Sequence, residues 1–157
     1  DIALKLLQQA LPFDASLLAA TRDALERPEP PLFFAQDLAG VAHAALDISD
    51  GLLQDLGHIL AASHCGAELD YDSLPVHQAL RGLPAAVQEA AVLGGGDVYE
   101  LCFTAAADRR ETVLALAHRA GVRATRIGRI TQGGDMIVRR ADGGVVAVPS
   151  GGFDHFG

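Results

Sequence analysis

The sequence contains one lysine, no asparagine, no tryptophan and two cysteines. The lysine, Lys5, precedes every glycine-rich segment, so no P-loop with its lysine after the last glycine is present. Without asparagine, the chain also lacks a protein-kinase catalytic loop. Cys65 and Cys102 form neither a C-x-x-C pair nor a zinc-finger spacing, which argues against a disulfide framework and against structural zinc.

Basic side chains are also scarce. Lysine and arginine together number 12 against 20 aspartates and glutamates, which gives a formal net charge of −8. We therefore expect no general nucleic-acid interface, although a local basic site for a phosphorylated small molecule is not excluded. The apolar runs are interrupted before the roughly 18 residues of a membrane span, and the N-terminus lacks the layout of a signal peptide. These absences predict a cytoplasmic protein without a membrane partner.

The chain has the length and the apolar content of one globular domain. It has 157 residues, of which 50% are hydrophobic and 20% charged. We therefore predict a single domain over residues 1–157, able to bury its own core. The sequence opens at Asp1 and runs directly into a helical pattern, which suggests a fragment of a longer protein.

Hydrophobic spacing predicts helices mainly in the first half and strands mainly in the second. Helices are expected twice within residues 1–26, on either side of Pro12 and Asp14, and over 34–43, 51–63, 75–80, 84–92 and 108–120. Gly66 and Gly121 are expected to end two of them. Strands are expected over 44–48, 67–71, 99–105, 124–130, 136–140 and 145–148, with Gly133–Gly134 and Gly143–Gly144 as turns. This order predicts an α+β fold with a mixed, largely antiparallel sheet that ends in a run of hairpins.

The densest polar cluster within apolar surroundings is Asp47-Ile48-Ser49-Asp50-Gly51. If a strand ends and a helix begins here, the oxygens of Asp47, Ser49 and Asp50 can converge on one cation. Magnesium takes one or two carboxylates together with phosphate oxygens and water, and the free N–H groups of a helix start suit a phosphate. The alternative is that Ser49 or Asp50 only caps the helix. The spacing favours the cap, and one residue can serve both roles.

A second candidate is the glycine run Gly94-Gly95-Gly96, which Asp97 follows. Three glycines permit positive φ angles and a close approach of the backbone to a ligand, and Asp97 could contact a cation or a polar group. The alternative is an ordinary flexible connection from helix to strand. Near the end of the chain, Phe153 follows two glycines, and its ring could cover the core or stack on a planar cationic ring.

In this order, the motifs resemble the C-terminal half of the thiamine-monophosphate kinase family, which is grouped with aminoimidazole ribonucleotide synthetase and selenophosphate synthetase. The matching segments are 27–30, 47–52, 55–59, 95–101, 127–130 and 152–156. The resemblance implies ATP-dependent phosphorylation of thiamine monophosphate to thiamine diphosphate, with direct transfer of the γ-phosphoryl group to the substrate phosphate. It also implies that an N-terminal ATP-binding domain is absent from this chain, that the full-length enzyme is a homodimer, and that the isolated domain is inactive.

Mapped onto this sequence, the resemblance implies that Asp47 and Asp50 bind Mg²⁺ and that Ser49 contacts ATP. Asp97 and Phe153 are implied to contact the substrate, and no catalytic acid, base or nucleophile is assigned to this chain. The family usually has glutamate and aspartate where this sequence has Asp97 and Val98. The first change shortens a side chain that can still reach the substrate through water, whereas the second removes a charge.

Two other functions remain open from the sequence. One is a related ATP-using synthetase of the same superfamily, acting for example on a purine precursor. The other is a non-catalytic binding or assembly module, for which the loss of charge at Val98 is the only support in the sequence.

Overall fold

A computed structural model describes residues 1–147 and confirms the α+β class. The helices are α1 (Ile2–Leu7), α2 (Ala15–Glu26), α3 (Leu32–Asp37), α4 (Leu52–Ser63), α5 (Ala85–Gly94) and α6 (Arg110–Ala120). The strands are β1 (Ala42–Asp47), β2 (Gly66–Asp70), β3 (Leu101–Ala105), β4 (Gly128–Thr131), β5 (Met136–Arg139) and β6 (Val145–Val146). Short 3₁₀ turns occupy Tyr71–Ser73, Gln78–Leu80 and Ala107–Arg109.

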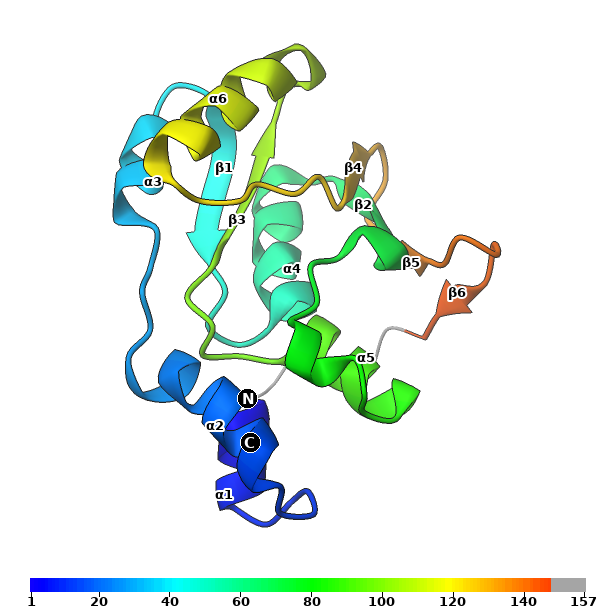
Figure 1. Ribbon diagram of the computed structural model, residues 1–157. Coiled ribbons are helices and arrows are strands. Elements are labelled where there is room, and N and C mark those ends of the chain that lie inside the picture. Colours follow the sequence, from blue (N-terminus) through cyan, green and yellow to red (C-terminus); the bar gives the residue numbers. More distant parts are fainter. Residues whose placement is uncertain (148–157) are drawn as a thin grey trace.

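The strands form two sheets. β1 and β3 pair antiparallel as a two-stranded sheet, and the other four strands form a sheet in the order β4-β2-β5-β6. In the larger sheet β2 and β5 run parallel, while the remaining pairs are antiparallel. The predicted mixed, largely antiparallel pairing is therefore confirmed (Figure 1).

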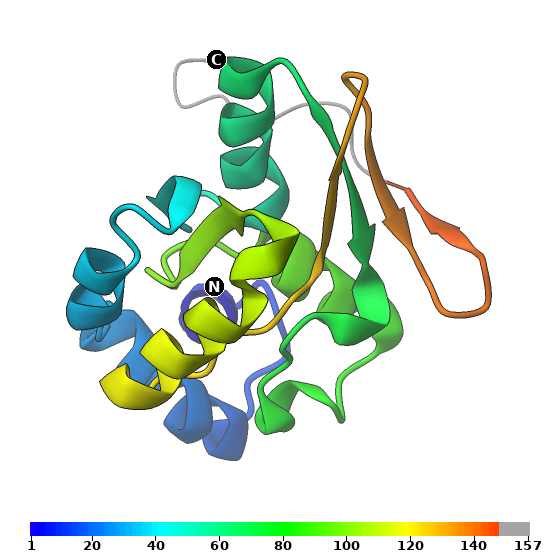
Figure 2. The same ribbon diagram turned by 90° about the horizontal axis from the view of Figure 1, so that it is seen from above.

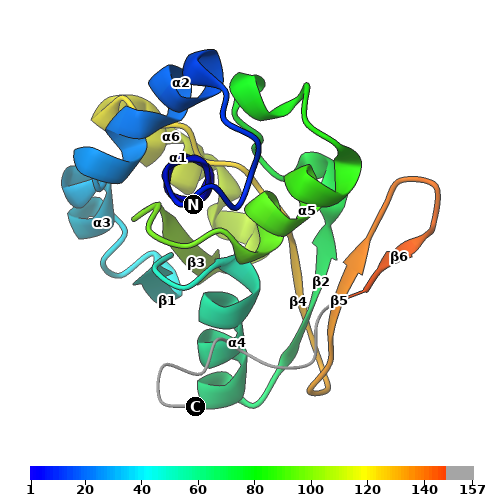
Figure 3. The same ribbon diagram turned by 90° about the horizontal axis from the view of Figure 1, so that it is seen from below.

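Helix α4 lies between the two sheets, as Figures 2 and 3 show. Its apolar face packs on buried side chains of β2, β5 and β6 and on Cys102 of β3. On the other side of the small sheet, α3 and α6 build a separate cluster around Phe34, Leu38, Val113 and Ala117. Alternate residues of β3 belong to different clusters: Leu101, Phe103 and Ala105 pack in the α3–α6 cluster, whereas Cys102 packs in the α4 cluster, so the small sheet contributes to both.

The remaining helices form a third cluster. Ile2 and Leu6 of α1 and Leu17 of α2 are buried, and partly buried apolar residues of α5 and of the segment before it pack against them. The two helices expected within residues 1–26 are therefore confirmed, with Asp14 as the N-cap of α2. Within residues 1–147, no helix combines the length and the apolar content that crossing a membrane would require.

The expectation of a helix over residues 34–43 is wrong in its second half. Helix α3 ends at Asp37, and Ala42 and His43 belong to β1. Gly40 has a φ of +79°, a left-handed conformation that ends the helical path and redirects the chain into the strand. Pairing of β1 with β3 then outweighs the local helical spacing.

The expectation of a strand over residues 124–130 is also only partly correct, because β4 begins at Gly128. The preceding residues connect two cores: Ala124 packs against the α3–α6 cluster, whereas Ile127 packs against the α4 cluster. A segment that crosses between cores cannot follow one sheet. The carbonyl of Ile127 accepts a hydrogen bond from the Asp70 N–H at 2.8 Å, which brings the chain into register for β4.

Gly66 does not end α4, contrary to expectation. The left-handed residue after Ser63 is His64, with a φ of 50°, and its N–H bonds the last turn. Gly66 begins β2, where a Cβ would lie 2.4 Å from the carbonyl oxygen of Asp135 and 2.7 Å from that of Gly133. The glycine is required by a close backbone crossing rather than by the helix end.

The position of β2 in the larger sheet also explains why the expected run of hairpins is wrong. β5 and β6 form a hairpin around Gly143, but β4 and β5 do not pair, because β2 lies between them. Ala67 and Leu69 of β2 are 2% and 3% exposed, and the strand pairs with β4 on one edge and β5 on the other. Burial of a central apolar strand therefore decides the order of the sheet.

Other expected elements differ mainly at their ends. The helix over 75–80 is reduced to the 3₁₀ turn Gln78–Leu80, and β3 begins at Leu101 because Tyr99 has a φ of 52°. Gly121 ends α6 with a φ of 69°, as predicted.

Candidate functional site

Two loops meet where β1 ends and β3 begins, at the lower edge of the small sheet in Figure 1. We call residues 47–51 the aspartate turn and residues 94–100 the glycine loop. The Ile48 N–H donates to the Glu100 carbonyl at 2.8 Å, and the Ile48 carbonyl accepts from the Tyr99 N–H at 3.1 Å. The Ser49 carbonyl accepts from the Asp97 N–H at 2.8 Å. These bonds continue the pairing of β1 with β3 and bring the two predicted motifs together.

Asp55, in the first turn of α4, organises the aspartate turn from below. Its Oδ2 accepts hydrogen bonds from the backbone N–H groups of Ser49, Asp50 and Gly51 at 2.9, 3.0 and 3.1 Å. The residue is 4% exposed and is the one buried charged residue among residues 1–147. Three converging donors supply the stabilisation that a buried carboxylate requires.

The sequence analysis missed this role of Asp55. One signal was available: the acid stands at helical spacing from Leu52 and Ile59, on the apolar face of a helix. A charged residue in that position is buried and needs donors. Those donors are the N–H groups of Ser49, Asp50 and Gly51, which precede the first residue of α4, Leu52.

The capping alternative is wrong, because the N-cap of α4 is Gly51, with a φ of 124°, and neither Ser49 nor Asp50 occupies that position. Asp50 uses its Oδ2 to accept a hydrogen bond from Gln54 Nε2 at 3.2 Å. Neither Ser49 nor Asp50 is therefore the N-cap of α4.

The backbone of the glycine loop lies close to the backbone of the aspartate turn. A Cβ on Gly96 would lie 2.3 Å from the Ser49 carbonyl oxygen, and one on Gly51 would lie 2.8 Å from the Gly94 carbonyl carbon. Positive φ angles in the loop occur at Asp97 and Tyr99, with values of 58° and 52°, and at none of its three glycines. Gly96 is therefore required by the close packing of the two backbones, whereas a Cβ on Gly94 would meet nothing within 4 Å.

The predicted site residues within the described part of the chain all lie on these two loops. Asp47 and Ser49 are exposed on the aspartate turn, Asp50 is half-buried, and Asp97 is exposed on the glycine loop. Phe153 lies outside the described residues. Residues 1–147 contain no group of three or more histidine, cysteine, aspartate or glutamate side chains that could hold a metal ion. Two carboxylates nevertheless fit a Mg²⁺ whose remaining ligands are phosphate and water.

Cys102 lies in β3 opposite Leu46 and is 6% exposed. Burial, and secondarily the negative charge of Asp55, raise the pKa of its thiol to about 11. The thiol therefore stays protonated at neutral pH and offers no nucleophile to the adjacent site.

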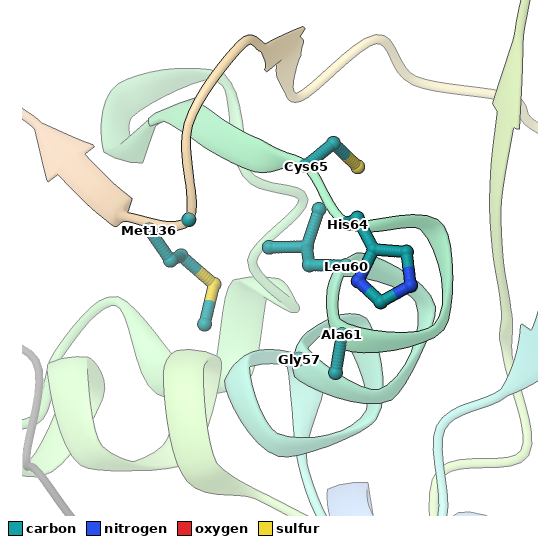
Figure 4. A pocket seen from close by; sticks show the side chains of 7 residues that line it. Gly57, Leu60, Ala61, His64, Cys65 and Met136 are labelled. Atoms are coloured by element: carbon teal, nitrogen blue, oxygen red, sulfur yellow. The ribbon is translucent and has the colours of Figure 1, made fainter.

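A cavity lies elsewhere, at the C-terminal end of α4. Its volume is about 310 Å³. Figure 4 shows Met136 facing the side chains of Leu60 and Ala61 across it, with His64 and Cys65 at its margin. The lining contains no carboxylate and no arginine, and it includes none of the predicted site residues.

Comparison with known proteins places the two loops within a matching region. Residues 19–140 match the family AIR synthase related protein, C-terminal domain. A relative from Haemophilus influenzae, named thiamine-monophosphate kinase, is 40% identical over 134 residues, which cover 83% of this chain and 41% of the relative.

Two solved structures are similar. The crystal structure of thiamine-monophosphate kinase from Stenotrophomonas maltophilia K279a is 44% identical with a TM-score of 0.78, and the match covers 92% of this chain and 46% of that one. A structure described as "AaThiL complexed with AMPPCP and TMP" is 26% identical with a TM-score of 0.74, covering 98% of this chain and 47% of that one. The chain thus spans less than half the length of these relatives.

Proposed function

This chain belongs to the AIR synthase related protein, C-terminal domain family, and on that premise we propose that it is the C-terminal part of a thiamine-monophosphate kinase. The proposed reaction transfers the γ-phosphoryl group of ATP to the phosphate of thiamine monophosphate and yields thiamine diphosphate and ADP. The observation that carries the proposal is the meeting of the aspartate turn and the glycine loop, each of which bears a motif of that family.

The aspartate turn is suited to hold a cation. Asp47 is the exposed last residue of β1 and Asp50 is half-buried, and we assign both as ligands of Mg²⁺. When bound, the ion supplies the positive charge that lets two anionic phosphates approach. We assign Ser49, which lies exposed between the two acids, as a contact to ATP.

The backbone N–H groups of residues 49–51 are not available to a phosphate. These three N–H groups already donate to Asp55, and the side chains of the turn contribute two carboxylates. Repulsion between these carboxylates and a phosphate favours the metal-bridged arrangement. This supports ATP with magnesium as the bound form of the co-substrate.

The glycine loop would supply the substrate contact. The Asp97 N–H is held by the Ser49 carbonyl, while its side chain is exposed beside the aspartate turn. We assign Asp97, together with Phe153, to thiamine monophosphate. Val98 is 40% exposed, so the departure from the family's usual aspartate changes the surface of the loop rather than its core.

The missing parts of the enzyme belong to the same proposal. Because the chain spans less than half of its relatives, we expect an N-terminal domain to provide the rest of the ATP site. The homodimeric state and the cytoplasmic location of the full-length enzyme remain predictions from the resemblance.

The test uses the full-length enzyme with ATP, Mg²⁺ and a panel of phosphorylated acceptors, including thiamine monophosphate and purine-precursor ribonucleotides. We expect ATP-dependent formation of thiamine diphosphate, measured by chromatography, and no product with the other acceptors. Turnover of a purine precursor alone would favour the related synthetase, and the absence of any phosphoryl transfer would favour a binding module.

A further inference from the structure

The backbone of the aspartate turn is held by hydrogen bonds at three successive N–H groups, those of Ser49, Asp50 and Gly51. All three bonds end on one atom, Oδ2 of Asp55. Of the two proposed ligands, Asp50 is one of the residues so held, and Asp47 lies two residues before the first of them. The orientation of their side chains follows from the backbone path of this turn.

We propose that Asp55 is a positioning residue, which sets the metal affinity of the site by holding the aspartate turn in place without itself touching metal or substrate. This inference rests on the proposed magnesium site of Asp47 and Asp50. Asp55 lies beneath the turn at 4% exposure, and its bonds join α4 to the segment between the two proposed ligands. Partners of this kind typically change metal affinity about 10- to 100-fold when they are replaced.

Burial restricts the movement of the Asp55 side chain. Asp55 stands among the apolar residues of α4, where Leu52, Leu56 and Ile59 are also buried, so its carboxylate has little freedom to move. Breaking one of its hydrogen bonds would leave a donor without a partner, most severely at the Gly51 N–H, whose bond is fully buried. The turn therefore has one strongly preferred conformation before any ligand binds.

The glycine loop holds the same turn from the other side. Its Asp97 N–H donates to the Ser49 carbonyl, while the Ser49 N–H donates to Asp55. The backbone of Ser49 is thus fixed at both of its polar groups. A disturbance at Asp55 would consequently reach the substrate side of the site as well as the metal side.

Two substitutions separate positioning from simple charge. Asp55→Asn keeps the size of the side chain but weakens the acceptor, and Asp55→Glu keeps the charge but displaces it by one methylene. Positioning predicts weaker metal binding in both variants, whereas a long-range effect of the negative charge predicts weaker binding in Asp55→Asn only. Asp14→Asn is the matched control, because Asp14 Oδ1 likewise accepts two helix N–H bonds, from Ser16 and Leu17, but at the distant α2.

The measurement is Mn²⁺ binding to the full-length enzyme in the presence of ADP, followed by electron paramagnetic resonance, together with the Mg²⁺ dependence of thiamine diphosphate formation. We expect the dissociation constant for Mn²⁺ to rise at least about tenfold in both Asp55 variants and to be unchanged in Asp14→Asn. Saturating Mg²⁺ should restore most of kcat, because the metal ligands themselves are intact.

Several results would overturn the proposal. Wild-type Mn²⁺ affinity in Asp55→Glu would assign the effect to charge, and wild-type affinity in both variants would remove any role in the site. Absence of Mn²⁺ binding by the wild-type enzyme would overturn the magnesium site itself and this inference with it. If neither variant folds, amide hydrogen exchange of the wild type decides: slow exchange at Ser49, Asp50 and Gly51 supports the anchored turn, and exchange as fast as in an open loop contradicts it.

Discussion

The two ends of helix α4 differ in almost every physical respect. At the N-terminal end the buried carboxylate of Asp55 accepts hydrogen bonds from three N–H groups. The backbones of the aspartate turn and the glycine loop also lie too close there for a Cβ on Gly96. At the C-terminal end a left-handed histidine ends the helix beside an apolar cavity of about 310 Å³. This cavity is therefore not where the family motifs lie. A site that binds through a metal and phosphates needs an exposed, rigid set of oxygens rather than an apolar hollow.

The largest difference is expected in how substitutions at the two ends of α4 change the turnover of the full-length enzyme. Asp47→Asn and Asp50→Asn in the full-length enzyme should fold normally and lose about a hundredfold in the rate of thiamine diphosphate formation, with partial rescue by raised Mg²⁺. His64→Gln, at the other end of the helix, should leave the rate unchanged. Steady-state kinetics over a range of Mg²⁺ concentrations is the measurement, and wild-type rates of both aspartate variants at low Mg²⁺ would contradict the assignment.

The second largest difference between the two ends of α4 is expected in how an added Cβ changes the free energy of unfolding. Gly96→Ala places a Cβ 2.3 Å from a carbonyl oxygen of the aspartate turn, and we expect it to lower the free energy of unfolding by about 3 kcal/mol. Gly57→Ala, within α4 and beside the cavity, meets nothing within 4 Å and should raise that free energy by about 0.5–1 kcal/mol. Urea denaturation of both variants tests the contrast, which equal effects would refute.

The two cysteines should respond differently to alkaline pH. Cys102, near the N-terminal end of α4, has its thiol pKa raised to about 11 in the folded protein, while an unfolded thiol ionises near 9. Between these values the unfolded state binds fewer protons, so stability falls as pH rises, by roughly 2–3 kcal/mol in all.

Cys102→Ala should remove this pH dependence, whereas Cys65→Ala, at the half-buried position beside the cavity, should retain it. Denaturation curves between pH 8 and pH 11 measure the effect. A slope that survives in Cys102→Ala would assign it to other groups.

The smallest expected effect concerns the end of the helix itself. His64 occupies a left-handed conformation with a φ of 50°, which glycine adopts without steric cost. His64→Gly should therefore stabilise the fold by up to about 1 kcal/mol, visible as a raised Tm. A lowered Tm would mean that the histidine ring contributes packing at the cavity margin that outweighs the backbone preference.

Local signals predicted much of the fold because they are strong where one segment decides its own structure. The break between α1 and α2 follows from Pro12 and the capping Asp14, and the end of α6 follows from Gly121. The same logic failed at residues 34–43, where the pairing of β1 with β3 overrode a helical spacing. It also failed for β4 and β5, which look like successive hairpin strands until a strand from far earlier in the chain is placed between them.

The candidate site shows the same division. The acids of the aspartate turn and the glycines before Asp97 stand out in the sequence, and the tertiary structure brings them together as expected from one site. The roles of individual groups were less accessible from the sequence: Asp55 binds N–H groups of the aspartate turn, and Gly96 serves a close contact between two backbones.

The sequence by itself determined the α+β class, the acidic character, the order of the motifs and the resemblance to a family, because composition and local spacing are properties of the chain alone. Only the tertiary structure decided that Asp55 anchors the aspartate turn, that β2 separates β4 from β5, and that Gly96 and Gly66 are needed for close crossings. These features depend on hydrogen bonds and exclusion of volume between segments distant in sequence. Which segments meet is settled by burial of the shared apolar core rather than by any local pattern.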